Sequence, residues 1–175
     1  MAAGVDLIQI RERDLSTREL SGLTAAAQSS AREHGASVLV NDRADVAASH
    51  NAGVHLTTRS LSAEVIRKAF GVEMIIGAST HTIEEVQAAE EGGVDFVVFG
   101  PVFETASKKV YGEPLGLEAL RGAASRSKIP VLALGGVTLS NYRETLEAGA
   151  AGVAGISMFT EARDLRTLVA TIKGA

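Results

Sequence analysis

Short apolar segments alternate with amphipathic segments along the whole chain of 175 residues. The apolar segments are rich in Val, Ile and Leu, which is typical of parallel strands covered on both faces. Regular alternation of such strands with helices predicts a parallel sheet, either doubly wound or closed into a barrel. We expect strands at residues 5–10, 37–40, 53–56, 74–76, 96–99, 131–134 and 152–156.

Signals for helix starts lie between these strands. Ser16 with Glu19, and Thr82 with Glu85, match the capping box, in which each side chain bonds a free backbone amide of the other residue. Three further residues are expected to be N-caps: Ser62, Ser140 and Thr160. The pattern is a βα unit repeated seven times, ending in a helix at residues 165–172.

Polar or glycine-rich residues follow every expected strand. In a (β/α)8 barrel the loops after the strands share one face, where the active site is built. In a doubly wound sheet, only the loops near the switch point carry that chemistry. The sequence therefore favours a (β/α)8 TIM barrel in the α/β class, formed by a single domain over residues 1–175. Seven units are visible and the start, MAAGVD, resembles the end of a helix, so we expect the barrel to lack its first βα unit.

Composition excludes several classes of protein. No apolar segment approaches the roughly 20 residues that a membrane-spanning helix needs, and the first residues lack the features of a signal peptide. The absence of cysteine excludes disulfides and thiolate metal sites. A net charge of −4 argues against a nucleic-acid surface. We expect a cytoplasmic protein without membrane or nucleic-acid partners, for which a homodimer is possible.

Candidate anion-binding residues follow the first two strands. Gln9, Arg11 and Arg13 alternate along an extended segment, so they would point to one side. Arginine presents a planar fork of donors that matches phosphate oxygens. Asn41 and Asp42 offer an amide and a hard oxygen ligand, which suit Mg²⁺.

Hydroxyls, lysines and glycines follow the later strands. Glycines beside a helix N-terminus suit phosphate, because bare backbone amides can approach it. The candidates are Ser79, Thr105, Ser107, Lys108, Gly135, Gly136, Ile156 and Ser157. Together with the arginines, such residues suit a diphosphate or two separate phosphates.

The first group also has an ordinary structural explanation. Arg13 could pair with Glu12 or Asp14 at a solvated strand end. Asn41 and Asp42 could cap a helix expected at residues 43–48.

The second group has structural explanations as well. Gly135 and Gly136 could form a tight turn, and Lys108 could belong to a solvated loop. His55 is expected to pack at a strand end rather than to bind a metal.

The motifs together resemble the thiamine phosphate synthase and TenI family, which shares a (β/α)8 barrel. The resemblance runs from residue 3 to the C-terminal helix and includes GVDLIQIRERDLS, VLVNDRADVA, GVHL, IIGASTHTIEEV, DFVVFGPVFETASKK, IPVLALGGVT and GAAGVAGIS. It implies a transferase of thiamine biosynthesis that joins hydroxymethylpyrimidine diphosphate to thiazole phosphate, with Mg²⁺, and releases diphosphate. In the family this reaction is thought to pass through a pyrimidine carbocation.

The resemblance also implies roles for individual residues. Arg11, Arg13 and Lys108 would be catalytic, and Asp42 would bind Mg²⁺. The diphosphate would be held by the two arginines with Gln9 and Asn41, and contacted on leaving by Lys108 and Ser79. The thiazole phosphate would be bound by Thr105, Ser107, Gly136 and the amides of Ile156 and Ser157. Gly135 is a further substrate-binding candidate.

Some positions depart from the family patterns. Arg13 stands where the synthases have Lys, and Ser60 stands where they have a Mg²⁺-binding Asp. The tautomerases of the TenI group use a His and a Cys for proton transfer, where this chain has Pro101 and Ser107. The alternatives are a TenI-like thiazole tautomerase and a non-catalytic protein that binds thiamine phosphate or thiazole phosphate.

Overall fold

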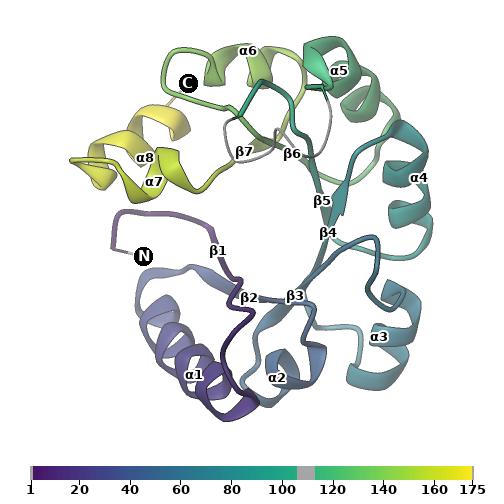
Figure 1. Ribbon diagram of the computed structural model, residues 1–175, viewed down its shortest axis with the longest axis vertical. Coiled ribbons are helices and arrows are strands. Elements are labelled where there is room, and N and C mark those ends of the chain that lie inside the picture. The colour runs from purple at the N-terminus through teal and green to yellow at the C-terminus, as the bar shows by residue number, and fades with distance from the viewer. Residues whose placement is uncertain (1, 106–112, 175) are drawn as a thin grey trace. The chain divides into compact units, whose positions relative to one another are not determined.

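The computed structural model describes residues 2–105 and 113–174. Within them, β-strands alternate with α-helices from one end to the other (Figure 1). The strands follow one another in the sheet in chain order, from β1 to β7. Contacts within the chain define two compact units, residues 1–77 and 78–175. The alternating α/β organisation expected from the sequence is confirmed.

The first unit contains three complete strands, which pair in parallel. They are β1 (Leu7–Ile10), β2 (Ser37–Asn41) and β3 (Gly53–Leu56). The helices are α1 (Thr17–His34), α2 (Ala44–Ser49) and α3 (Ala63–Phe70). All four residues of β3 and the central three of β2 are buried, as expected for strands covered on both faces.

The fourth strand, β4 (Ile76–Thr80), begins in the first unit and ends in the second. The second unit continues with β5 (Phe96–Phe99), β6 (Val131–Leu134) and β7 (Gly152–Ala154), which pair in parallel. Its helices are α4 (Ile83–Glu91), α5 (Gly116–Arg126), α6 (Tyr142–Glu147), α7 (Ser157–Thr160) and α8 (Leu165–Lys173). No helix in the described residues has the length and apolar character needed to cross a membrane.

The largest error in the expected strands concerns β4. The strand was expected at residues 74–76 with polar or glycine-rich residues after it, but the segment GAST at residues 77–80 lies within β4. Ala78 and Thr80 are buried there, and the Thr80 carbonyl accepts a bond from the Gly100 N–H at 3.2 Å. Pairing with β5 therefore overrides the weak strand preference of these small residues. β1 and β7 are also shorter than expected.

The helix starts agree in part with the sequence. The Ser16–Glu19 capping box is reciprocal, with the Glu19 carboxylate 2.8 Å from the Ser16 N. Thr82 accepts from the Glu85 N–H, but Glu85 bonds the His81 N–H instead of closing a box.

Among the single N-caps, Ser62 is confirmed, since it accepts from the Val65 N–H. The prediction of Ser140 as an N-cap is wrong, because the N-cap of α6 is the next residue, Asn141. The prediction of Thr160 as an N-cap is also wrong, because Thr160 is the last residue of α7 and Asp164 is the N-cap of α8.

Candidate functional site

The carboxyl ends of β1, β2 and β3 place three polar side chains on one face of the first unit's strands. Gln9 lies opposite Leu39 in the β1–β2 register, and Asn41 lies opposite His55 in the β2–β3 register. Side chains two residues apart on a strand share a face, so Gln9, Asn41 and His55 project to the same side. This set is called the first-unit cluster, together with Arg11 and Asp42.

Gln9 and Asn41 contact each other directly. The Gln9 Nε2 donates to the Asn41 Oδ1 at 2.9 Å. Since the oxygen of Asn41 accepts this bond, its NH₂ group is the part suited to donate to an anion. This contact agrees with the sequence analysis, which placed Gln9 and Asn41 in one group of candidate residues.

His55 is buried, with 3% of its surface exposed. Burial, and secondarily the positive charge of Arg11, lower the pKa of His55 to about 4. The imidazole is therefore neutral at pH 7. The sequence indicated that His55 packs at a strand end, which is confirmed, but it missed the coupling to Arg11. The signal that could have revealed this coupling is the position of His55 in GVHL, at the end of a strand.

Arg11 and Arg13 are both exposed and follow the end of β1 at Ile10. Arg13 lies in a bend, so the alternation that places Gln9 and Arg11 on one side does not extend to it. Among the described residues, no ion pair joins Arg13 to Glu12 or Asp14, so the structure gives no support to that explanation.

Asp42 turns the chain sharply after β2. Its φ of 57° is left-handed, a conformation that Asp tolerates better than most residues. Its N–H donates to the His55 carbonyl at 2.9 Å, and its side chain is exposed. Neither it nor Asn41 caps α2, whose N-cap is Arg43 without a side-chain bond, so the capping explanation is wrong.

Ser60 uses its side chain to close a turn at the end of β3. Its Oγ accepts from the Thr57 N–H at 2.8 Å, while its own N–H donates to the Thr57 carbonyl at 3.0 Å. In residues 2–105 and 113–174, no three His, Asp or Glu side chains gather into a metal-binding group. Within the first-unit cluster as defined above, Asp42 supplies the carboxylate.

Loss of stability in acid is expected from His55. Its pKa is lower in the folded state than the ordinary value of 6.5, so the unfolded chain binds more protons between pH 6.5 and 4. The contribution of neutral His55 to the free energy of unfolding is complete above pH 6.5 and is lost as pH falls towards 4. It amounts to about 3 kcal/mol.

Urea unfolding across pH 4–7 would measure this dependence. The His55→Gln variant, which does not titrate in this range, is the control. The difference in unfolding free energy between the two proteins should change with pH, and a constant difference would contradict the assignment.

In the second unit, the backbone after β5 runs beside the end of β6. The Val102 N–H donates to the Leu134 carbonyl at 2.9 Å, and the Phe103 N–H donates to the Gly135 carbonyl at 3.0 Å. Thr105, half-buried, is the last described residue of this segment. Ser107 and Lys108 lie outside the described residues. Ser79 is half-buried near the end of β4.

Gly135 and Gly136 have a steric reason to be glycine. Their φ angles are 96° and 65°. A Cβ on Gly136 would lie 2.4 Å from the Glu104 carbonyl oxygen, and one on Gly135 would lie 2.6 Å from the Pro101 Cα. The tight-turn explanation is thus supported. It is compatible with anion binding, because the Gly136 N–H donates to no residue that the structure describes.

Ile156 and Ser157 lie at the start of the short helix α7. Both are exposed, and the first amides of a helix have no partner within it. Among the described residues, neither amide donates to a partner.

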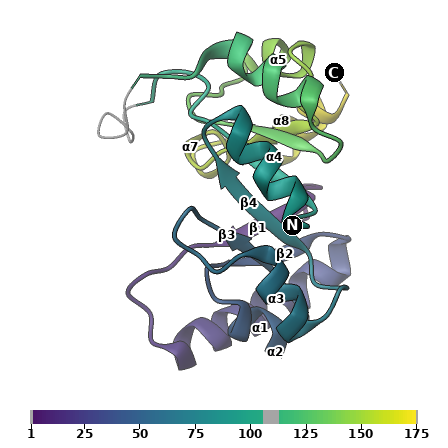
Figure 2. The same cartoon turned by 90° about the vertical axis from the view of Figure 1, so that its right-hand side faces the viewer.

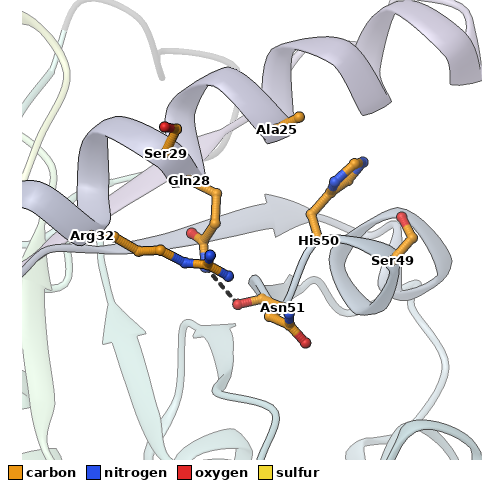
Figure 3. Close-up of a pocket in the computed structure, with 7 residues that line it drawn as sticks. All are labelled: Ala25, Gln28, Ser29, Arg32, Ser49, His50 and Asn51. Atoms are coloured by element: carbon orange, nitrogen blue, oxygen red, sulfur yellow. Dashed lines mark hydrogen bonds between the residues drawn. The ribbon is translucent and has the colours of Figure 1, made fainter.

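A surface hollow lies on the helical side of the first unit (Figure 3). The Gln28 Nε2 donates to the Asn51 carbonyl at 2.6 Å, and the His50 Nε2 bonds the Ser21 Oγ at 2.8 Å. The hollow is formed by the ends of α1 and α2 that lead into β2 and β3, which is the side of a βα fold associated with stability rather than catalysis. None of the predicted site residues lines it.

These features define a class of protein. Cations, amides and hydroxyls follow the carboxyl ends of parallel strands in an α/β fold, which is where enzymes of this architecture bind their substrates.

Comparison with known proteins narrows this class to a family. The family model for thiamine monophosphate synthase (TMP-TENI) matches residues 1–159. The thiamine-phosphate synthase of Moorella thermoacetica is 40% identical over 166 residues, covering 94% of this chain and 79% of that protein. The thiamine-phosphate synthase of Chlorobium luteolum is 42% identical over 163 residues, covering 93% and 77%.

A solved structure agrees with the sequence comparison. Thiamine phosphate pyrophosphorylase from Pyrococcus furiosus matches with a TM-score of 0.87 and 35% identity, over 99% of this chain and 84% of that chain. The chain belongs to the thiamine monophosphate synthase family.

Proposed function

We propose that this chain is a thiamine-phosphate synthase that joins hydroxymethylpyrimidine diphosphate to thiazole phosphate. The observation that carries the proposal is the first-unit cluster, in which the bonded pair Gln9–Asn41 and the cation Arg11 stand at strand ends. The chain is at least 40% identical to the two synthases compared above.

The reaction requires the departing diphosphate to be stabilised. The carbon–oxygen bond of the pyrimidine breaks and diphosphate leaves with the electron pair. The thiazole nitrogen then supplies its lone pair to form the new carbon–nitrogen bond. Arg11 and Arg13 would hold the departing negative charge, and Asn41 would donate to it. Donors fixed before the reaction stabilise such charge without reorganisation, usually the largest catalytic effect.

Mg²⁺ fits these residues as an ion carried with the diphosphate. Asp42 offers one exposed carboxylate, and Mg²⁺ is commonly held by one or two carboxylates together with substrate phosphates. The ion would neutralise charge on the leaving group. The hydroxyl of Ser60 is engaged in its own turn, so Asp42 would be the main protein ligand.

The second-unit residues would hold the thiazole phosphate. The N–H of Gly136, which donates to no described residue, and the first amides of α7 are donors of the kind that bind phosphate. The resemblance assigns the remaining contacts to Thr105 and Ser107, with Ser79 and Lys108 on the leaving group.

The proposal extends to the architecture and setting of the protein. We propose a (β/α)8 barrel in a cytoplasmic protein that has no nucleic-acid partner, supported by the parallel strand order and the net charge of −4. The lack of a first βα unit remains a prediction. A homodimer is part of the proposal.

The deciding experiment is incubation of the chain with hydroxymethylpyrimidine diphosphate, thiazole phosphate and Mg²⁺, with thiamine phosphate measured by mass spectrometry. Product that Lys108→Ala reduces by about 10²–10³, while Lys128→Ala leaves it unchanged, would establish the synthase. Absence of product, with thiazole phosphate still bound in calorimetry, would instead identify the non-catalytic binding protein. No structural observation favours the tautomerase alternative.

Ser60→Asp should lower the Mg²⁺ concentration needed for half-maximal rate by about tenfold, as expected if a second carboxylate ligand contributes about 1.4 kcal/mol. Aspartate can also accept the Thr57 N–H, so the turn should persist. Ser60→Asn keeps that acceptor without the charge and is the matched control. An equal shift in both variants would exclude a metal-binding role for this position.

A further inference from the structure

His81 occupies the short link between a strand and a helix of the second unit. It follows Thr80, the last residue of β4, and precedes Thr82, the N-cap of α4 (Figure 2). The His81 N–H donates to the Glu85 carboxylate at 2.6 Å, so the backbone here is already turned towards the helix. The reaction proposed for this chain assigns no role to the imidazole of His81.

The imidazole adds one further bond to the pairing of β4 with β5. In a regular parallel ladder, each bonded residue donates to one residue of the neighbouring strand and accepts from the residue two positions further on. The Gly100 N–H donates to the Thr80 carbonyl at 3.2 Å, so the Gly100 carbonyl would pair with the N–H of Thr82. The chain instead enters α4 there, and the His81 Nδ1 bonds the Gly100 carbonyl.

The acceptor of this bond determines the form of the ring. A backbone carbonyl only accepts hydrogen bonds, so the Nδ1 carries the proton and the Nε2 of the neutral ring is an acceptor. Gly100 is buried, and of the residues that the structure describes, no other donates to its carbonyl. A buried carbonyl is costly to leave without a donor. The His81 side chain therefore holds the backbone at Gly100 in place.

Gly100 begins the segment that carries part of the second-unit site. The N–H groups of residues 102–103 donate to carbonyls at the end of β6. The chain then passes so close to Gly136 that an added Cβ there would lie 2.4 Å from the Glu104 carbonyl oxygen. Thr105 follows directly. A shift of the backbone at Gly100 would therefore alter the surroundings of the Gly136 N–H and the position of Thr105.

We propose that His81 is a positioning residue for the anion site formed by Thr105 and the Gly136 N–H. Its bond to the Gly100 carbonyl holds residues 100–105 against the end of β6. The inference rests on the proposed function, in which these two groups bind the thiazole phosphate. It adds a residue that touches no substrate but fixes the relative position of two groups that do.

Three substitutions of His81 separate this bond from the rest of the side chain. Asparagine places its Nδ2 where histidine has Nδ1, glutamine places its amide near the position of Nε2, and alanine has no donor. Binding of thiazole phosphate, measured by calorimetry, should weaken about tenfold in His81→Ala and His81→Gln, whereas His81→Asn should keep most of the affinity. His34→Ala, which changes an exposed histidine of α1, is the control and should leave binding unchanged.

Two NMR measurements test the positioning without any substrate. The Val102 and Phe103 N–H groups are bonded to the Leu134 and Gly135 carbonyls. Their hydrogen exchange should accelerate about tenfold in His81→Ala and His81→Gln, but not in His81→Asn. In the unmodified chain, the ¹⁵N shifts of the neutral ring should show the proton on Nδ1.

Unchanged exchange in every variant, or a neutral ring protonated on Nε2, would overturn the proposal. Faster exchange without any loss of thiazole phosphate binding would also overturn it, because the segment would then not determine the site. Failure of the proposed function gives a different result. An unmodified chain that binds no thiazole phosphate contradicts that function, and the exchange and tautomer measurements still decide whether His81 holds the segment.

Discussion

Replacement of Arg11 by glutamine should lower kcat/KM for thiamine phosphate formation by about 10²–10³, the loss typical of removing one preorganised donor from a developing anion. Arg11 is exposed and follows the end of β1, so the free energy of unfolding should change little. Steady-state kinetics and urea unfolding of the same preparation would separate the two effects. Arg18→Gln, an exposed arginine on α1, is the control and should have full activity.

The same variant has a second readout that a purely structural role would not produce. The charge of Arg11 is one cause of the lowered pKa of His55. In Arg11→Gln, that pKa should rise part of the way towards 6.5, because the larger cause, burial, remains. NMR titration of the imidazole would measure the change. An unchanged rate would remove Arg11 from the mechanism, and an unchanged pKa would show that the two residues are not coupled.

Gly136→Val should destabilise the protein by about 3 kcal/mol or more. Two costs combine: a β-branched residue in the left-handed region, and overpacking of a site without free space. The added Cβ would lie 2.4 Å from the Glu104 carbonyl oxygen, so the backbone of residues 103–104 would have to move. Urea unfolding would measure the loss, and binding of thiazole phosphate should weaken in parallel.

Gly22→Ala is the matched control for this substitution. Gly22 lies within α1, and a Cβ there meets no atom within 4 Å. Alanine should therefore stabilise the helix by about 0.5–1 kcal/mol. If Gly136→Val were no more harmful than Gly22→Ala, the close approach at Gly136 would be wrong.

The parts of the fold that depend on local pattern could be predicted from the sequence. Strands β3, β5 and β6 have the expected bounds. A buried segment rich in Val, Leu and Phe has few conformations other than a strand that cover its side chains. The bounds of β4 could not be predicted, since its small and hydroxyl-bearing residues adopt the strand only through pairing with β5.

Some features of the candidate site could likewise be predicted from the sequence, and others could not. That Gln9 and Asn41 meet follows from parallel strands ending at a common edge, which the sequence pattern indicates. The influence of Arg11 on His55 depends on burial and distance, which the sequence does not contain. The steric need for Gly136 arises from contact with Glu104, more than thirty positions away. No local motif could show that reason.

The left-handed backbone at Asp42 affects how its carboxylate can be studied by mutation. Alanine there would add a conformational penalty of about 1–2 kcal/mol to the loss of charge. Alanine scanning would therefore exaggerate the importance of the carboxylate. Asparagine tolerates the same φ and removes only the charge, and glycine removes the whole side chain without the penalty. Comparison of the asparagine variant with the unmodified chain isolates the electrostatic part of what Asp42 contributes, and comparison of the asparagine and glycine variants isolates the part due to the neutral side chain.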